Sequence, residues 1–391
     1  MAGVDLELLR SELAELTDDP GVVDVARVLR RHGQPVDEEG VLAAVRQLRR
    51  HSRGAGLLDD LLRLDGVTDV LVNGPEEVYL DRGQGLERCQ VQFEDDAAVR
   101  QLATRIAAAA GRRLDEGSPY VDARLPDGTR VHAILAPVAD PGTCISLRVP
   151  ARRTLDLAAW AGDAAGEAAV AAVGDVVAQR ASFLVTGGTG SGKTTLLSSM
   201  LALVDPGERI VVVEDSREIN PRHPHLVRLE ARPANAEGRG RVDLTDLIRQ
   251  ALRMRPDRLV VGEVRGAELT DLLTALNTGH EGGCGTVHAN GVAELPARLA
   301  ALGALAGWQE SAVRAQALAA LDVIVHVERR GGQRRIAEIG VLTTGPGGEL
   351  SCVTALRFDP GPAAADAGRR TVHEPVRRGP GHRQLSERLG W

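Results

Sequence analysis

A glycine-rich run near the middle of the chain has the residue types and spacing of a phosphate-binding site. Residues 187–194 have the sequence GGTGSGKT, which fits the pattern G-x-x-x-x-G-K-[ST]. An apolar stretch, 181–186, precedes the run and predicts a buried strand, and residues 195–201 after it predict a helix. The glycines let the backbone curl, so that successive N–H groups and the helix N-terminus face an anion. We therefore interpret the run as a phosphate-binding loop and not as a turn that contains a chance lysine.

The basic residue of this loop is distinguished by composition. Lys193 is the only lysine of the chain, whereas the other 46 basic side chains are arginines. A lysine ends in a compact ammonium group that fits among phosphate oxygens, where the guanidinium group of an arginine would be too large. The presence of lysine at this position supports a direct contact with phosphate.

Acidic residues follow the next predicted strand, 209–213. They form the run EDSRE, in which Glu214 and Glu218 flank Asp215. Carboxylates at the end of a strand that neighbours a phosphate loop can polarise an attacking water molecule and hold it in line with the γ-phosphate. The alternative is a solvated acidic turn. Glu214 and Glu218 are both candidates, and the sequence does not decide between them.

Another carboxylate follows the apolar strand 258–261. This acid is Glu263, and a glycine precedes it. An apolar strand that ends in an acid near a phosphate loop is the arrangement in which a carboxylate holds Mg²⁺ or its water. Because glutamate is longer than the usual aspartate, we expect Glu263 to hold a metal-bound water, or the nucleophile, and not the metal directly.

A histidine ends the predicted strand 284–288. A histidine in this position, His288, can donate a hydrogen bond to the γ-phosphate and report its loss. A lone histidine is more often a hydrogen-bonded structural residue. Here its position in the run 278–290 favours the role of a γ-phosphate sensor. The H-x-E pattern of a zinc deaminase is excluded, because no cysteine pair accompanies His280 or Glu281.

The elements around these residues predict an α/β fold. Strands and helices alternate from residue 154 to 358 at the spacing of a mainly parallel sheet with crossover helices. The predicted strands are 182–186, 209–213, 226–230, 258–262, 284–288 and 322–328, with two further β-rich stretches near 335–342 and 351–357. The candidate residues therefore fall at strand ends, where α/β sheets place their sites.

Two other parts of the chain precede this predicted α/β domain, and one part follows it. Residues 57–150 predict a smaller α/β domain, with a hairpin at Asn73-Gly74 and a helix that begins after Asp95 and ends at Gly111. Residues 1–50 predict helices, which could form a docking module or a helical cap. Residues 359–391 are rich in Gly, Pro, Ala and Arg, so we expect a disordered tail.

Composition limits the possible partners. The net charge of −7 argues against broad electrostatic binding of nucleic acid. The presence of only eight aromatic side chains argues against a surface that stacks single-stranded bases. The four cysteines are scattered, which predicts free thiols in a reducing cytosol and excludes a four-cysteine zinc module. The N-terminus lacks a basic signal sequence, and no apolar run reaches about 18 residues. We therefore expect a cytoplasmic protein without a transmembrane segment.

Taken together, the motifs resemble those of the secretion-motor ATPases of type II and type IV secretion and pilus assembly. The resemblance covers roughly residues 57–345 and favours the branch of tight-adherence (Tad/Flp) pili and conjugal-transfer-like ATPases, because the four-cysteine zinc element of many type II motors is missing. The matching runs are GGTGSGKTT (187–195, Walker A), EDSRE (214–218, Asp box centred on Asp215), LRMRPDRLVVGEVRG (252–266, Walker B), TGHEGGCGTVHAN (278–290, His box) and LDEGSPYVDARLPDGTRVHA (114–133), which resembles a segment that lies over the nucleotide.

The resemblance implies roles for individual residues. ATP is the implied nucleotide and Mg²⁺ the implied metal. Lys193 would hold the β- and γ-phosphates, and Thr194 would ligate Mg²⁺ while Glu263 holds it through water. Arginines of the smaller domain would clamp phosphates, although their individual contacts cannot be assigned. The implied nucleotide-binding residues are Gly187, Gly188, Thr189, Gly190, Ser191, Gly192, Lys193, Thr194, Thr195, Arg113, Arg130 and Arg148.

The resemblance also implies an architecture and partners. The larger domain would be a RecA-like P-loop ATPase domain and the smaller one PAS-like, with ATP between them. The subunits would form a homohexamer, peripheral to the inner face of the membrane, whose domain motions act on inner-membrane platform proteins of a secretion or pilus system. The alternatives are a DNA-translocating motor of the conjugation type and a nucleotide-binding regulator without useful hydrolysis.

Overall fold

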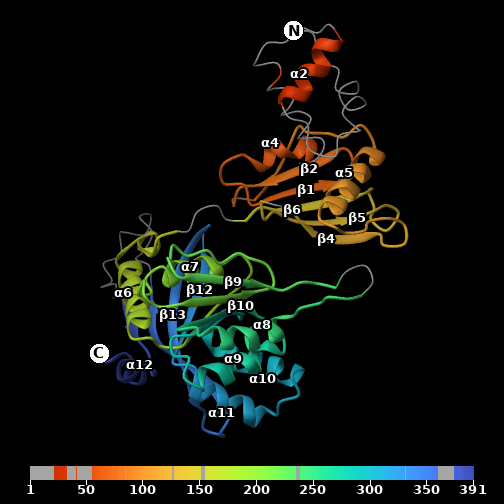
Figure 1. Ribbon diagram of the computed structural model, residues 1–391. Helices are drawn as coiled ribbons and strands as arrows, with labels where there is room; N and C mark the ends of the chain where they lie inside the picture. Colours follow the sequence, from red (N-terminus) through yellow and green to blue (C-terminus); the bar gives the residue numbers. More distant parts are fainter. Residues whose placement is uncertain are drawn as a thin grey trace. The chain divides into compact units, whose positions relative to one another are not determined.

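The computed structural model describes most of the chain as two compact units. The described residues are 22–32, Val41, 55–83, 85–125, 127–150, 155–234, 238–330, 332–359 and 374–391. The units comprise Met1–Pro150 and Ala151–Trp391, and Figure 1 shows both as mixed α/β structures. Most of the helical segment expected at 1–50 lies outside the described residues, within which α2 spans Val22–Arg31.

The first unit is built on an antiparallel sheet. Its described strands pair in the order β3-β2-β1-β6-β5-β4. Buried and half-buried residues alternate along β1, β2 and β5, as in a sheet with one covered face. The strands are β1 (Asp69–Asn73), β2 (Glu77–Asp81), β3 (Leu86–Arg88), β4 (Tyr120–Arg124), β5 (Arg130–Ile134) and β6 (Cys144–Arg148).

Helix α5 (Asp96–Ala109) contributes to the buried core of this sheet, together with the short helix α4 (Asp59–Leu62). Asp95 caps α5, since its side chain accepts a hydrogen bond from the N–H of Ala98. The hairpin expected at Asn73-Gly74 joins β1 to β2, with Asn73 opposite Glu77. The next strand, β3, has only three residues, and all of them are exposed.

The second unit contains a larger, mainly parallel sheet. Within the described residues its strand order is β15-β14-β13-β12-β7-β11-β10-β8-β9. The pairs from β12 to β9 are parallel, whereas β13, β14 and β15 are added antiparallel. The strands are β7 (Phe183–Gly187), β8 (Ile210–Glu214), β9 (Leu226–Glu230), β10 (Arg258–Val264), β11 (Cys284–His288), β12 (Val323–Arg330), β13 (Gln333–Thr344), β14 (Leu350–Phe358) and β15 (Val376–Arg378). Each of the eight stretches predicted as strands overlaps one of these strands.

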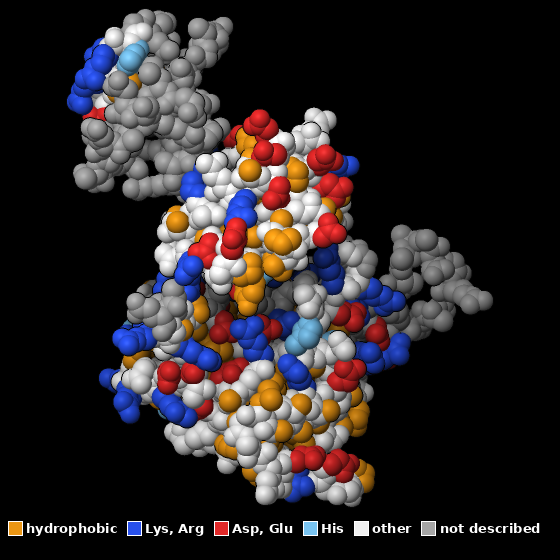
Figure 2. Space-filling view, turned by 90° about the vertical axis from the view of Figure 1, so that its right-hand side faces the viewer, with side chains coloured by type: hydrophobic (Ala, Val, Ile, Leu, Met, Phe, Trp, Pro, Cys, Tyr) orange, Lys and Arg blue, Asp and Glu red, His pale blue; other side chains and the backbone are white. Residues whose placement is uncertain are grey.

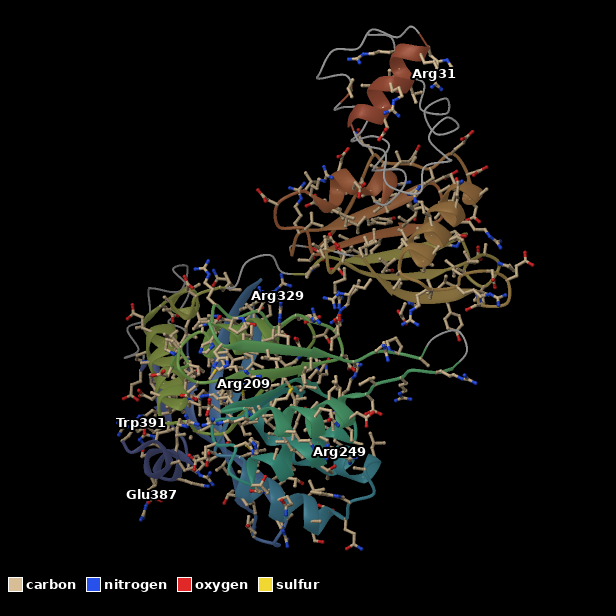
Figure 3. All side chains as sticks on the ribbon, in the orientation of Figure 1. Arg31, Arg209, Arg249, Arg329, Glu387 and Trp391 are labelled. Atoms are coloured by element: carbon tan, nitrogen blue, oxygen red, sulfur yellow. The ribbon has the colours of Figure 1, made fainter. Side chains whose placement is uncertain are left out.

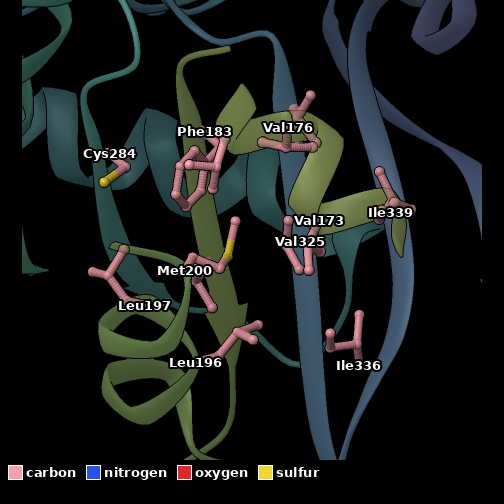
Figure 4. Packing of buried hydrophobic residues seen from close by; sticks show 14 of the residues in the cluster. Val173, Val176, Phe183, Leu196, Leu197, Met200, Cys284, Val325, Ile336 and Ile339 are labelled. Atoms are coloured by element: carbon pink, nitrogen blue, oxygen red, sulfur yellow. The ribbon is translucent and has the colours of Figure 1, made fainter. Parts of the chain in front are cut away.

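Helices cover both faces of this sheet, so its central strands are buried on both sides (Figure 1). One face packs against α6 (Ala164–Ala178), α7 (Lys193–Leu201) and α12 (His382–Leu389). The other packs against α8 (Leu244–Ala251), α9 (Glu268–Leu276), α10 (Leu295–Leu305) and α11 (Glu310–Ala320). Figure 4 shows the first layer, in which Phe183 of β7, Met200 of α7 and Val176 of α6 gather.

The end of the chain corrects the prediction of a disordered tail over 359–391. Residues 376–378 form β15 at the edge of the sheet, and α12 follows it. Leu385 and Leu389 lie one helical turn apart and are fully buried in the core. Trp391, labelled in Figure 3, donates a hydrogen bond from its indole N–H to Asp175 of α6 at 3.0 Å. The preceding Gly, Pro and Arg residues obscured this short amphipathic helix.

Candidate functional site

The phosphate-loop sequence lies between β7 and α7, as the pattern predicts. Gly187 ends β7, and Lys193 begins α7. Gly192, at the N-cap of α7, has a φ of +101°, which favours glycine. A Cβ atom on Gly187 would lie 2.5 Å from both the Ser191 hydroxyl and the carbonyl oxygen of Val327. The glycines are therefore required by backbone conformation and by close packing.

Lys193 lies inside the curl of this loop. Its Nζ donates hydrogen bonds to the carbonyl oxygens of Gly187 at 3.1 Å and Gly188 at 3.0 Å. Burial lowers the pKa of Lys193, while the charges of Glu263 and Glu218 act in the opposite direction. The ammonium group is thus held at the loop by backbone oxygens and faces an acidic neighbourhood.

His288 contacts the phosphate loop from the adjacent strand. It ends β11, which pairs with β7 so that His288 is opposite Gly187. Its Nδ1 lies 3.4 Å from Lys193 Nζ, and its Nε2 lies 3.5 Å from the Thr189 hydroxyl. The two ring nitrogens therefore reach both arms of the loop, and the side chain itself is exposed.

The carboxyl ends of parallel strands bring the predicted acids to the same edge of the sheet. Glu214 is the last residue of β8, and Glu263 lies near the end of β10, between β8 and β11 in the sheet. Glu263 is exposed there, whereas the rest of β10 is buried. Figure 2 shows charged side chains of both signs and histidine together on one face of the second unit. The structure thus places the candidates as the strand pattern predicts.

Glu214 and Glu218 differ in their surroundings. Glu214 is 3% exposed, and its Oε1 accepts hydrogen bonds from the backbone N–H groups of Glu218 and Ile219, both at 2.9 Å. Its Oε2 is buried and has no hydrogen-bond partner among the described residues. Burial raises the pKa of Glu214, and the two N–H groups partly offset this. Glu218 is exposed. Glu214 therefore organises the turn that presents Glu218.

Asp215, the centre of the acidic run, forms an ion pair with Arg265 of the segment after β10. Burial raises the pKa of Asp215, and the charge of Arg265 opposes that rise. Glu268 of α9 accepts hydrogen bonds from the backbone N–H groups of Arg265 at 2.6 Å and Gly266 at 2.7 Å. These contacts tie the turn after β8 to the turn after β10.

The structure places the three predicted arginines of the first unit in two different surroundings. Arg130 of β5 is directly opposite Arg148 of β6, and on its other side it is opposite Arg124 of β4. Arg148 donates from Nε to Asp69 at 3.1 Å. Arg113 lies outside this cross-strand row and pairs with Asp115. Sequence reasoning missed Arg124, although the Asp-Gly turn at 127–128 predicts a hairpin that places it opposite Arg130.

Two further side chains that the sequence did not single out lie at the loop. A Cβ atom on Gly192 would be 2.9 Å from Cδ of Arg334 and 3.1 Å from the Trp160 ring. Trp160, in the turn before α6, also donates to the Ser199 hydroxyl of α7 at 3.4 Å. A signal for Arg334 existed, since pairs of arginines flank the Gly-Gly turn at 331–332. No comparable signal marked Trp160.

The donor set fits magnesium better than a transition metal. No group of three or more His, Cys, Asp and Glu side chains that could hold a metal occurs among the described residues. Near Lys193 the available donors are the carboxylates of Glu218 and Glu263, with the hydroxyl of Thr194 next in the chain. Oxygen donors in small number suit Mg²⁺, which keeps several waters and binds substrate phosphates.

None of the described helices is long and apolar enough to cross a membrane.

Comparison with known proteins gives consistent matches. The family model described as "Type II/IV secretion system protein" matches residues 52–337. A relative named a conjugal transfer protein, from Mycobacterium tuberculosis, is 57% identical over 316 residues, which are 79% of this chain and 90% of the relative. The type IV secretion system protein PtlH of Bordetella pertussis is 33% identical over 70% of this chain and 89% of its own length. The solved ATPase DotB of Legionella pneumophila has a similar fold, with a TM-score of 0.50, 21% identity and coverage of 78% of this chain and 80% of that one.

Proposed function

The chain belongs to the type II/IV secretion system protein family, and from that premise we propose that it hydrolyses ATP, with Mg²⁺, to power a secretion or pilus-assembly machine. The membership confirms the family expected from the sequence motifs. The observation that carries the proposal is the position of His288, whose ring nitrogens lie against Lys193 and Thr189. A histidine placed there contacts the loop on which a γ-phosphate would rest.

The geometry supports one distribution of roles at this site. Lys193 and the backbone N–H groups of 187–195 bind the phosphates, and Thr194 with Glu263 holds Mg²⁺, Glu263 through a water molecule. The metal supplies charge neutralisation on the phosphate oxygens. Glu218 orients or activates the attacking water, because it is exposed and close enough to act on the charge of Lys193, whereas Glu214 is enclosed. His288 senses the γ-phosphate.

Phosphate contacts by arginines of the first unit form part of the same proposal. The cross-strand row supports Arg130 and Arg148, with Arg124 as an addition, because register places these arginines opposite one another in the sheet. Arg113 lies outside the row; it pairs with Asp115, as Arg148 pairs with Asp69. An arginine that contacts the transferred phosphate would stabilise the charge of the transition state.

The finer assignments extend the proposal to the whole assembly. We propose a RecA-like ATPase domain at 154–358, a PAS-like domain at 57–150 and a homohexamer in the cytoplasm that acts on inner-membrane platform proteins. The lack of a four-cysteine element supports the tight-adherence and conjugal-transfer-like branch, and the 57% identical relative of Mycobacterium tuberculosis is named a conjugal transfer protein. Measurement of the mass of the purified protein with and without a non-hydrolysable ATP analogue tests the hexamer.

Hydrolysis is tested directly with loop variants. Purified wild-type protein is expected to release phosphate from Mg-ATP, and Lys193→Ala is expected to abolish release while the circular dichroism spectrum stays unchanged. Lys193→Arg is the matched control for charge, and it should also fail, because the planar guanidinium group does not fit the curl of the loop. Glu263→Gln should bind ATP and hardly turn it over. Wild-type turnover in Lys193→Ala would refute the assignment.

A DNA-translocating motor is the second candidate, because several relatives are named conjugal transfer proteins. This function requires that DNA stimulate hydrolysis and that the stimulation weaken steeply with salt. We expect no stimulation, given the net charge of −7 and the few aromatic side chains. Phosphate release with and without single- and double-stranded DNA at two salt concentrations separates the candidates.

A further inference from the structure

Buried polar side chains lie in one row across the sheet beneath the phosphate loop. Thr186 of β7, His326 of β12 and Glu338 of β13 are exposed by 0%, 5% and 8%. Thr186 is the register partner of His326 in the parallel pair, and His326 is the partner of Glu338 in the antiparallel pair. Their neighbours along these strands are mostly apolar and buried. Polar groups in such a place lower stability unless they are hydrogen-bonded.

The contact between the first two members reaches the phosphate loop. The Thr186 hydroxyl lies 2.9 Å from Nδ1 of His326, which is a hydrogen bond. Thr186 directly precedes Gly187, and the carbonyl oxygen of Gly187 accepts a hydrogen bond from Lys193. His326 therefore lies one residue and one hydrogen bond away from the backbone that holds the lysine. Within the described structure its ring forms no hydrogen bond with Lys193 or with His288.

The third member fixes the segment that follows His288. Glu338 accepts a hydrogen bond through Oε1 from the N–H of Val292 at 3.3 Å and through Oε2 from the Thr354 hydroxyl at 3.0 Å. Val292 is only four residues beyond His288 in the sequence. The same row thus anchors both the start of the phosphate loop and the chain that leaves its histidine.

Burial favours the neutral form of the His326 ring. Burial lowers the pKa of His326, the nearby carboxylates of Glu338, Glu328 and Glu294 oppose the shift, and Lys193 reinforces it. A neutral imidazole can donate or accept at Nδ1, and a threonine hydroxyl can do either in return. A leucine would fill similar space without this directional contact, so the distinctive contribution of His326 is orientation of Thr186.

We propose that His326 is a positioning residue for ATP hydrolysis, which fixes the Gly187 end of the phosphate loop through its hydrogen bond with the Thr186 hydroxyl. This rests on the proposed ATPase function. In P-loop chemistry the protein contributes mainly position and charge, so a small displacement of the loop reduces the rate even when the fold persists. Neither residue belongs to the set proposed to contact the phosphates.

Four variants of the full chain test the role. Thr186→Val and His326→Leu each remove the hydrogen bond at nearly constant volume, and each is expected to lower kcat about tenfold or more. The double variant should lose no more than the more impaired single variant, because both changes remove one contact. His326→Asn retains a polar atom near the position of Nδ1 and should restore kcat to within about threefold of wild type. The unfolding temperature and the affinity for a fluorescent ATP analogue are measured in parallel.

Thr143→Val is the matched control. Thr143 is fully buried in the first unit, outside the residues proposed to bind nucleotide, and its hydroxyl donates to Asp96 at 3.1 Å, so this change also removes a buried hydrogen bond but should leave kcat unaltered. The proposal is overturned if Thr186→Val and His326→Leu keep kcat within about twofold of wild type, or if their losses multiply in the double variant. Failure of wild type itself to hydrolyse ATP would overturn the proposed function. If wild type hydrolyses ATP and Lys193→Ala does not, the proposed function stands, and the Thr186 and His326 variants then test the positioning role alone.

Discussion

Replacement of the two glutamates around Asp215 separates a structural acid from a catalytic one. Glu214→Gln keeps an oxygen that can accept the hydrogen bonds from the N–H groups of Glu218 and Ile219, and it removes only the charge. Glu218→Gln leaves the turn intact and removes the exposed carboxylate. Both substitutions preserve size, so any difference in turnover reports the role of each charge and not a change in packing.

The expected magnitudes follow from the contacts. A positioned general base contributes roughly 10²–10⁴-fold to a rate, which corresponds to about 2.7–5.4 kcal/mol at 1.36 kcal/mol per factor of ten. We expect Glu218→Gln to lose activity in this range and Glu214→Gln to stay within about tenfold of wild type. Glu214→Ala leaves two N–H groups without their acceptor, at a cost to stability of about 1–3 kcal/mol each.

The raised pKa of Glu214 favours the opposite assignment, in which Glu214 is the general base. Burial raises the pKa of Glu214, which brings the group closer to the pKa that suits a general base. Geometry argues against that role, because Oε1 accepts hydrogen bonds from two N–H groups and Oε2 is enclosed, with no hydrogen-bond partner in the part of the chain that the structure describes. Single-turnover phosphate release and binding of a fluorescent ATP analogue are measured for both variants. Loss of turnover in Glu214→Gln with retention in Glu218→Gln would refute the reasoning.

Two further predictions concern stability. Glu208→Leu should lower the free energy of unfolding in urea by about 3–5 kcal/mol, because it removes the carboxylate that Arg258, which is only 2% exposed, contacts at 2.8 Å. The control Glu387→Leu breaks an exposed ion pair within a helix, and it should lower the same free energy by less than about 0.5 kcal/mol. Since burial lowers the pKa of His326 from its ordinary 6.5, the unfolded state binds its proton more readily, and the free energy of unfolding should fall as the pH drops below about 6.5. This fall should be smaller in His326→Asn, and an identical pH dependence in the two proteins would contradict it.

Much of the second unit could be predicted from the sequence, because its strands are short apolar runs between turn signals. Stretches such as 209–213 have no competing periodicity, and their burial on both faces leaves little choice of structure. The parallel arrangement then places residues that follow the strands at a common edge. That rule places Glu263 and His288 at the edge of the sheet that carries the phosphate loop, whereas the pairing of β11 with β7, which brings His288 against the loop, is not contained in the sequence pattern.

Other features depend on contacts that a linear pattern does not contain. Glu214 and Glu218 have the same chemistry, and only the folded turn encloses one of them. Trp160 approaches Gly192 from a segment about 30 residues upstream, without a local signal. The final helix was overlooked because its two buried leucines follow a long glycine- and proline-rich stretch. In each case tertiary packing decided the role of a residue whose type was ambiguous.

The strand order of the large sheet has a consequence for synthesis of the chain. β7, which begins the phosphate loop, is flanked in the sheet by β11 and β12, and its partner in β12 follows it by 140 positions. At ribosomal rates of about 5–20 residues per second, β12 emerges roughly 7–28 s after β7. During that interval the apolar segment 183–187 lacks at least one of its two neighbours, and such exposed strands promote aggregation. Among the described strand pairs this separation is the largest, so the strand that begins the phosphate loop waits longest for its last neighbour.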